Sequence, residues 1–132
     1  MSDSFPAVYP LLWSDDVGVI ADWLVRCLGF TEVWRSPDAK QSVEHAELAW
    51  QNGRVSINVK SAQYAGAGPA GIAVRVAENA EVDRLFALAT GQGAEIVQNL
   101  LDSPVAYSFT AADPDGNSWW VHAETGFLDQ LR

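Results

Sequence analysis

The chain has little cysteine, few basic residues and no long hydrophobic run. Its single cysteine, Cys27, excludes an intrachain disulfide framework and a zinc site built from cysteines. Lys and Arg number 8 against 17 Asp and Glu, so the net charge is -9. We expect no nucleic-acid partner, because binding to phosphates needs a basic surface. No apolar stretch is long enough to span a bilayer and no signal-peptide pattern is visible, so we predict a cytoplasmic protein without membrane association.

What the chain does contain is enough apolar material for one ordinary domain. Its 132 residues are 48% hydrophobic and include six tryptophans, which suffices for a sizeable core. The acidic charge has two interpretations. It favours a cationic ligand through its field, or it simply keeps the protein soluble.

The most informative stretch runs from Asp113 to His122. Pro114 fixes the first turn corner and Gly116 supplies a positive φ, so a tight turn is predicted. An apolar run follows at once, as in the return strand of a hairpin. Because side chains alternate along a strand, Trp120 and His122 share one face with Ser118, while Trp119 and Val121 share the other.

The same order of elements occurs twice along the chain. Each half reads as strand, helix, short strand, strand, tight turn and strand. The glycines that end the two helices, Gly29 and Gly93, lie 64 residues apart, and the turn glycines Gly53 and Gly116 lie 63 apart. We therefore predict one domain, 1–132, made of two βαβββ modules at about 5–61 and 70–124. A Gly- and Ala-rich linker, 62–69, joins them, and a tail, 125–132, follows.

These residues resemble the vicinal oxygen chelate superfamily, the group of glyoxalases, bleomycin-resistance proteins and extradiol dioxygenases. The resemblance is carried by Trp13-Ser14-Asp15 before the first helix, by Leu28-Gly29-Phe30 at its end, by His45-Ala46-Glu47-Leu48, and above all by Asp113-Pro114-Asp115-Gly116-Asn117. It implies an α+β fold in which two βαβββ modules form curled mixed sheets around a cavity. It also implies that a homodimer is common.

In this family, metalloenzymes take ligands from the first strand of each module and from the last strand. The matching positions here are about Val8, Gly71 or Ile72, and Trp120. None of these side chains has an oxygen, nitrogen or thiolate donor suited to a metal ion. The resemblance therefore implies the fold but not its ordinary metal chemistry, and we predict no cofactor, with one divalent metal as the alternative.

If the strands of this chain turn the same faces toward the cavity as those of the family, the cavity is lined by Val8, Leu12, Arg75, Trp120 and His122. Leu11 and Trp13 would then pack on the helices. Such an aromatic wall suits a flat or apolar ligand. The alternative for Trp120 is an ordinary core tryptophan. Arg75, if buried, needs a carboxylate partner such as Glu47; otherwise it extends to water from a strand end.

Two functional hypotheses follow. The first is metal-independent binding of a planar aromatic or cationic small molecule, such as an antibiotic, which is sequestered in the aromatic cavity. The second is a metal-dependent lyase, isomerase or dioxygenase-like enzyme that uses His45, Glu47 and His122 as ligands or as proton-transfer groups. His45 and Glu47 share a strand face, but the simpler alternative is that both face solvent or form hydrogen bonds across strands. A dimer without a small-molecule role is a third possibility.

Overall fold

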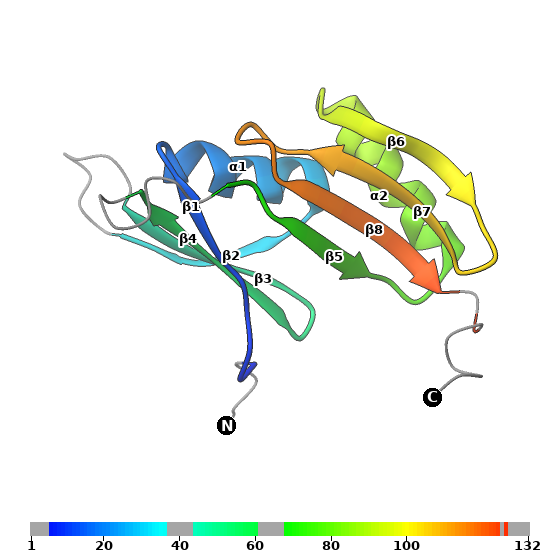
Figure 1. Ribbon diagram of the computed structural model, residues 1–132, viewed down its shortest axis with the longest axis horizontal. Helices are drawn as coiled ribbons and strands as arrows, with labels where there is room; N and C mark the ends of the chain where they lie inside the picture. The colour runs from blue at the N-terminus through cyan, green and yellow to red at the C-terminus, as the bar shows by residue number, and fades with distance from the viewer. Residues whose placement is uncertain (1–5, 37–43, 61–67, 125, 127–132) are drawn as a thin grey trace. The chain divides into compact units, whose positions relative to one another are not determined.

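The computed structural model describes residues 6–36, 44–60, 68–124 and 126. They form two units, residues 1–69 and 70–132. Each unit is a βαβββ module with one four-stranded mixed sheet and one helix (Figure 1). The predicted α+β fold of two repeated modules with curled mixed sheets is thereby confirmed. Residues 62–67 of the predicted linker 62–69, and all of the predicted tail except Gly126, lie outside the described residues.

Unit 1 has its first strand paired in parallel with its last. Its elements are β1 (Leu11–Ser14), α1 (Val17–Leu28), β2 (Thr31–Arg35), β3 (His45–Trp50) and β4 (Gly53–Val59). The strand order is β1-β4-β3-β2, with β3 antiparallel to both of its neighbours. The strands that follow one another after the helix are therefore joined as hairpins, and β1 is added at the far edge.

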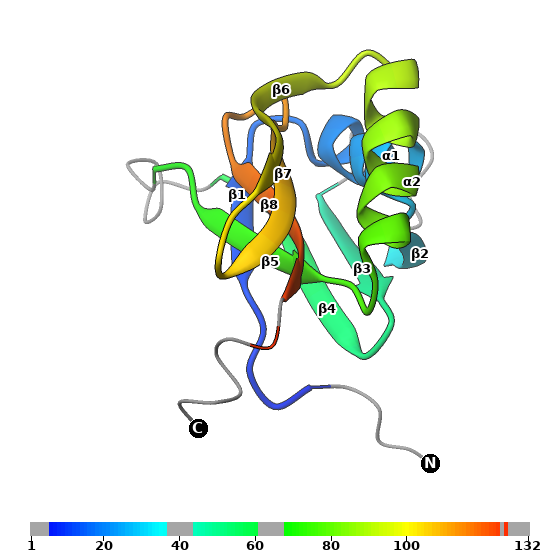
Figure 2. The same ribbon diagram turned by 90° about the vertical axis from the view of Figure 1, so that its right-hand side faces the viewer.

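Unit 2 repeats this topology. Its elements are β5 (Gly71–Arg75), α2 (Asn79–Gly91), β6 (Glu95–Asp102), β7 (Ala106–Ala112) and β8 (Ser118–Glu124). The strand order is β5-β8-β7-β6, again with the parallel pair at one edge. Figure 2 shows α2 lying along one side of the sheet of this unit.

Helix α1 begins and ends where its sequence predicts. The side chain of Asp16 accepts a hydrogen bond from the backbone N–H of Val19 at 3.3 Å, which satisfies one of the free donors of the first turn. Gly29 ends the helix with a φ of 74°, a conformation that costs glycine little. The buried residues of the helix recur at helical spacing: Val17, Ile20, Ala21, Trp23, Leu24, Cys27 and Leu28.

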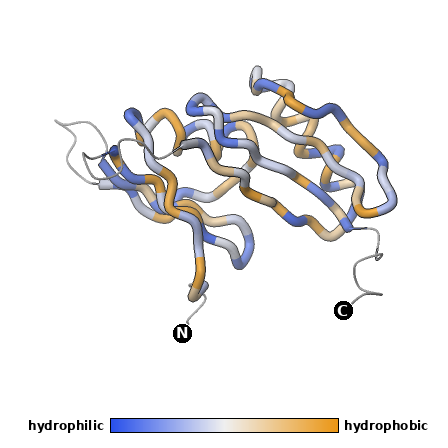
Figure 3. The backbone as a smooth tube through the Cα atoms, viewed as in Figure 1, coloured by the Kyte–Doolittle hydropathy of each residue, from blue (hydrophilic) through white to orange (hydrophobic). Residues whose placement is uncertain are grey.

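Each sheet has one apolar face and one face of mixed chemistry, as expected for a helix packed on one side only. In unit 2, Phe86 of α2 makes an edge-on contact with Phe109 of β7, with ring centroids 5.3 Å apart. This contact identifies the helix-covered face. The buried residues that share it are Val74, Phe109, Ala111, Trp119, Val121 and Ala123. The variation of hydropathy along the strands can be followed in Figure 3.

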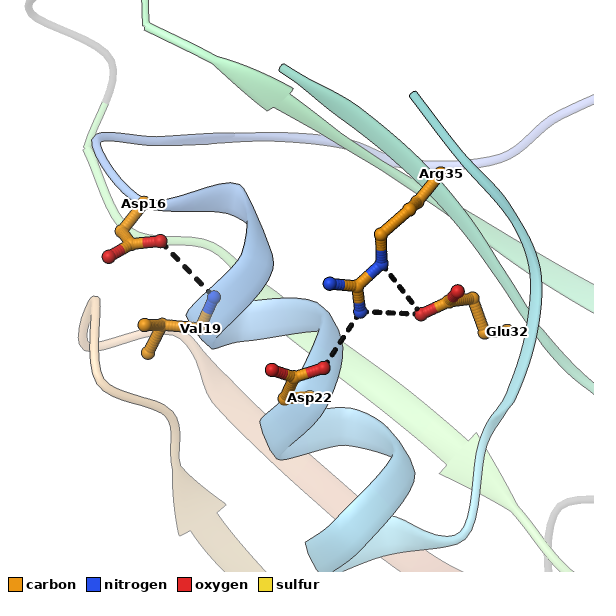
Figure 4. A network of polar contacts seen from close by, with 5 residues as sticks. All are labelled: Asp16, Val19, Asp22, Glu32 and Arg35. Carbon is orange, nitrogen blue, oxygen red and sulfur yellow. Dashed lines mark hydrogen bonds and ion pairs between the residues drawn. The ribbon is translucent and has the colours of Figure 1, made fainter. Parts of the chain in front are cut away.

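A surface ion-pair network ties α1 to β2. The guanidinium of Arg35 lies between Asp22 of α1, 2.7 Å from Nη2, and Glu32 of β2, whose Oε1 is 2.5 Å from the same nitrogen (Figure 4). The hydrogen bonds to Glu32 and to Asp22 raise the pKa of Arg35 above its ordinary value. The network links side chains of the edge strand β2 and of the helix α1.

The first strand differs from its prediction in two ways. It begins at Leu11, later than the predicted module start at about residue 5, because pairing with β4 starts only at the carbonyl of Pro10, which accepts from the backbone N–H of Ser56. Val8 therefore lies before the sheet and is 88% exposed. The two faces of β1 are also the reverse of those predicted. Leu12 is buried in register with Ile57, whereas Leu11 is exposed.

Neither α1 nor α2 is both long and apolar enough to cross a membrane, and these are the helices of the described part of the chain.

Candidate functional site

The turn before β8 is held by one buried carboxylate. Asp113, 4% exposed, accepts four hydrogen bonds of 2.9 Å. Its Oδ1 binds the backbone N–H groups of Asp115 and Asn117, and its Oδ2 binds the side chains of Asn117 and Trp119. The last of these bonds anchors Trp119 on the helix-covered face. Since successive side chains alternate, Trp120 is thereby directed to the opposite face.

We call that opposite side the helix-free face of unit 2. It carries Gly71, Ala73, Arg75, Ser108, Thr110, Ala112, Ser118, Trp120, His122 and Glu124. Trp120 and His122 stack on it, with ring centroids 3.9 Å apart and planes 11° from parallel. His122 is 5% exposed and Trp120 is half-buried. The structure therefore confirms that these two residues share a face, and it makes the imidazole a rigid support behind the indole.

The indole of Trp120 has a second ring face that His122 does not cover. His122 lies toward the C-terminal end of β8, so this second face is turned toward the N-terminal end, where Ser118 pairs with Gly71. Gly71 is exposed, and a Cβ atom built on it meets nothing within 4 Å. Beside the indole, the sheet thus has a floor of small side chains and open space above it.

His122 is the histidine of this face. Its Nδ1 is buried and has no hydrogen-bond partner among the described residues. Burial lowers the pKa of His122 below its ordinary value, and Arg75 lowers it further, while Glu124 opposes the change. The imidazole is therefore neutral at pH 7, which suits a stacking support better than a charged group would.

Arg75 is exposed and lies near the carboxylate of Glu124. It lies in register with His122, its side chain is 61% exposed, and its Nη2 is 3.5 Å from Oε2 of Glu124. Glu47 belongs to the other unit, and it contacts His45 instead. Of the two alternatives that the sequence leaves open for Arg75, the structure shows the exposed one. A signal was present in the sequence, because Glu124 lies two residues beyond His122 and so shares its face.

In unit 1, His45 and Glu47 contact each other as their shared strand face predicted. Nε2 of His45 is 2.6 Å from Oε2 of Glu47, and Nδ1 is 2.7 Å from Oδ1 of Asn58. Both ring nitrogens of His45 are therefore already engaged. His122, the third member of the predicted metal or proton-transfer set, belongs to unit 2.

The donor set does not fit the metal site that the fold would imply. At the positions of the ordinary ligands stand Val8, Gly71 or Ile72, and Trp120, which offer no suitable donor atom. His45 could bind a metal only by giving up one of its two hydrogen bonds. Within the described residues, no group of three or more His, Cys, Asp and Glu side chains is arranged to hold a metal ion.

Two of the predicted ligand contacts lie away from the helix-free faces. Val8 precedes β1, and Leu12 is packed in the core of unit 1, 4% exposed. Sequence reasoning considered Gly71 only as a ligand position without a donor atom, although a glycine inside a strand is also a known sign of close approach by another molecule or chain. Unit 1 also has an open hollow of about 690 Å³, lined by Asp22, Val25, Arg26, Phe30, Thr31 and Glu32. None of the predicted site residues lines it.

The family model described as Glyoxalase/Bleomycin resistance protein/Dioxygenase superfamily matches residues 7–121 of the chain. Among solved structures, TioX from Micromonospora sp. ML1 is similar, with 28% sequence identity over 90% of this chain and 99% of that one, and a TM-score of 0.78. No curated protein matches the chain as a relative.

Two further solved structures are less similar in sequence. A glyoxalase/bleomycin resistance protein/dioxygenase family enzyme from Burkholderia phytofirmans PsJN has 17% identity, covering 88% of this chain and 96% of that one, with a TM-score of 0.69. A lactoylglutathione lyase from Agrobacterium tumefaciens also has 17% identity, covering 89% and 92%, with a TM-score of 0.70. At this identity the likeness shows a shared fold alone.

Proposed function

Because this chain belongs to the glyoxalase/bleomycin resistance protein/dioxygenase superfamily, we propose that it binds a planar aromatic small molecule without a metal ion and releases it unchanged. The binding surface is the helix-free face of unit 2, and the ligand stacks on Trp120. In a cell, such a protein sequesters a toxic compound such as an antibiotic.

The observation that carries this proposal is the stacked pair of Trp120 and His122. A tryptophan that only fills a core is covered on both ring faces, but Trp120 is half-buried and has one ring face supported by a neutral imidazole at 3.9 Å. Its other ring face is turned toward the open space above Gly71. A rigid indole beside a floor of small side chains accepts a flat ring with little loss of conformational entropy.

Charge extends the range of ligands that this face accepts. The net charge of -9 draws cations toward the protein, and Trp120 binds a cationic ring by cation–π attraction as well as by stacking. Arg75 of β5 has an exposed guanidinium and lies two residues beyond Ala73, which is the register partner of Trp120. Because Arg75 is in register with His122, it lies on the other side of the indole from Gly71, so a ligand stacked from the side of Gly71 finds no counter-charge for an acidic substituent there.

The experiment is a binding titration followed by intrinsic tryptophan fluorescence. The probes are three flat compounds that differ in charge: 9-aminoacridine, 1-naphthol and anthracene-9-carboxylate. We expect at least one of them to quench the protein saturably, and Trp120→Ala to weaken its binding by about tenfold or more. Trp120→Phe keeps an aromatic ring and loses less. The control is Trp34→Ala, which removes a half-exposed indole from unit 1. Unchanged affinity in Trp120→Ala would contradict the proposal.

The absence of a metal requirement has its own test. Elemental analysis of natively purified protein is expected to show no stoichiometric transition metal, and added Zn²⁺, Ni²⁺ or Mn²⁺ is expected to leave ligand affinity unchanged. About one tightly held metal ion per chain would instead favour an enzyme that uses His45, Glu47 or His122.

We further propose that the protein is a cytoplasmic homodimer. Sedimentation analysis of the purified chain measures the dimer, and cell fractionation measures the location.

A further inference from the structure

The outer side of helix α1 carries apolar and charged side chains next to one another. Its exposed residues lie along one stripe of the helix, because they are three or four positions apart: Val19, Asp22, Val25 and Arg26. The open hollow of about 690 Å³ lies beside this stripe, since Asp22, Val25 and Arg26 line it together with residues 30–32. We call the residues that line the hollow the α1–β2 surface. It includes Phe30, which is 5% exposed, so the hollow reaches the edge of the core of unit 1.

The charges at the α1–β2 surface balance, unlike those of the chain as a whole. The carboxylates of Asp22 and Glu32 share one guanidinium, that of Arg35 (Figure 4). These three residues together keep one net negative charge, and Arg26 in the last turn of α1 supplies one positive charge. Within the described ranges, Arg26 forms no ion pair. An unpaired cation and an excess of carboxylate therefore lie on one surface, on either side of Val25.

A surface with both signs of charge is complementary to a second copy of itself. In an interface with twofold symmetry each contact between different residues occurs twice, so a cation of either chain can meet an anion of the other. The chain as a whole is less suited to self-association, because two molecules of net charge -9 repel each other. The α1–β2 surface avoids this repulsion, and Val25, 41% exposed, adds apolar area that association removes from water.

The exposed apolar edge of unit 2 suits a second copy less well. Strand β6 lies at the edge of its sheet and exposes Val97, Leu100 and Leu101. It begins with Glu95 and ends with Asp102. Two antiparallel copies of β6 paired over their full length place Glu95 of each chain opposite Asp102 of the other. Like charges that face each other at both ends oppose this pairing, so the α1–β2 surface is the better contact between two copies.

We propose that two copies of this chain associate through the α1–β2 surface, about a twofold axis beside Val25. Val25 of each chain packs against the hollow of the other, and Arg26 of each chain binds the partner's Asp22 and the partner's Glu32. This inference rests on the homodimer proposed above and assigns the surface that forms it. The surface belongs to unit 1, and none of its residues is on the ligand face of unit 2.

Sedimentation equilibrium of the full chain measures the dissociation constant of the dimer. We expect Val25→Asp to raise this constant by about tenfold or more, because it places a carboxylate from each chain in the apolar part of the contact. The matched control is Val97→Asp, the same change at an exposed valine of β6, and it is expected to leave the constant unchanged. Far-ultraviolet circular dichroism checks that both variants fold.

An exchange of charge between two chains tests the ion pair itself. In Arg26→Glu and in Asp22→Arg, like charges face each other across the twofold axis, so we expect each variant alone to associate about tenfold more weakly or worse. In an equal mixture, the introduced carboxylate of one chain faces the introduced guanidinium of the other. Mixed dimers are therefore expected to form with nearly the original affinity, and native mass spectrometry identifies them by mass. Both variants are expected to fold, because exposed ion pairs contribute little to stability.

Three results would overturn the proposal, and they differ in what else they overturn. A dimer as tight in Val25→Asp as in the unaltered chain would place the contact on another surface and leave the homodimer intact. Failure of the mixed variants to form dimers would show that Arg26 does not face Asp22 across the contact. An unaltered chain that is monomeric at every concentration would contradict the homodimer as well. Restored association in the mixture has no explanation in misfolding, because misfolded chains do not regain a dimer when combined.

Discussion

His122 lies flat against the indole of Trp120, at 3.9 Å and 11° from parallel, and it occupies one of the two ring faces of that tryptophan. The two residues are two positions apart on β8, so their side chains leave the same side of the sheet and must lean together to touch. One ring face of the indole is therefore covered and the other is open to a ligand. Ligand can reach the indole only from the side of Ser118 and Gly71.

Because the open ring face is turned toward Gly71, substitutions of Gly71 test whether a ligand binds there. A Cβ at this residue meets nothing within 4 Å, and its φ is not positive, so a larger side chain is accepted without strain. We expect Gly71→Ala to weaken binding of a flat ligand slightly and Gly71→Val to weaken it by about tenfold or more by filling the space beside Trp120. Valine also suits a strand better than glycine does, so the free energy of unfolding stays equal or rises.

The measurement is a ligand titration of the two variants together with urea unfolding. Gly91→Ala is the control, since Gly91 is the last residue of α2 and also has open space at its Cβ. If Gly71→Val bound ligand as tightly as the unaltered chain, the ligand would not use this side of the indole.

The lowered pKa of His122 predicts a pH dependence of stability. In the unfolded chain His122 titrates near its ordinary value of 6.5, and in the folded protein it titrates at lower pH. Between these two values the unfolded state binds more protons, so the free energy of unfolding falls as pH decreases below about 6.5. The slope from one such group is at most about 1.4 kcal/mol per pH unit.

The measurement is urea unfolding at several pH values between 7.5 and 5, compared with His122→Gln. The difference between the two proteins isolates the contribution of His122 from that of the carboxylates, which also titrate toward low pH. We expect the variant to show a flatter profile over this window. Parallel profiles would mean that His122 is as easily protonated in the folded protein as in the unfolded one.

Much of the fold could be read from the sequence because its signals are local. The spacing of Gly29 from Gly93 and of Gly53 from Gly116 reflects helix ends and turns that depend on neighbouring residues only. The alternation along β8 likewise fixed which face Trp120 shares with His122.

The candidate site could be predicted less well, because it depends on where pairing begins and on which long side chains meet. The faces of β1 were reversed because the prolines before it hide the first paired residue, and a shift of one residue exchanges the faces of a strand. The exposure and the partner of Arg75 stayed open in the sequence, because a long flexible side chain at a strand end can either pair with a carboxylate or extend to water. The support of Trp120 by His122 is a matter of side-chain rotation that residue spacing does not specify.

The ion-pair network of Arg35 is expected to contribute little to stability. The side chain of Arg35 is 27% exposed, and that of Asp22 is 62% exposed. Partly exposed ion pairs typically contribute up to about 1 kcal/mol, because water screens the charges and ordering the side chains costs entropy. We expect Arg35→Met to lower the free energy of unfolding by about 1 kcal/mol or less, and 0.5 M NaCl to reduce the difference between the two proteins. A much larger loss in urea unfolding would show that the network holds α1 and β2 together.

Asp113 is expected to contribute far more than the surface network, because its four hydrogen bonds are buried and divided between its two oxygens. In Asp113→Asn one oxygen becomes an NH₂ group, and whichever way the amide turns, it meets two donors. Either the backbone N–H groups of Asp115 and Asn117 or the side chains of Asn117 and Trp119 lose their acceptor. A buried donor without a partner costs about 1–3 kcal/mol, so we expect a loss of about 3 kcal/mol in the free energy of unfolding.

Near-ultraviolet circular dichroism and urea unfolding measure this effect. The control is Asp115→Asn, which changes a carboxylate in the same turn whose Oδ2 has no hydrogen-bond partner among the described residues. Since the turn sets the register of β8, Asp113→Asn is also expected to weaken ligand binding at Trp120, whereas Asp115→Asn is not. If Asp113→Asn were as stable as the unaltered protein, the direction of Trp120 would have to be set by strand pairing alone, without the anchoring of Trp119.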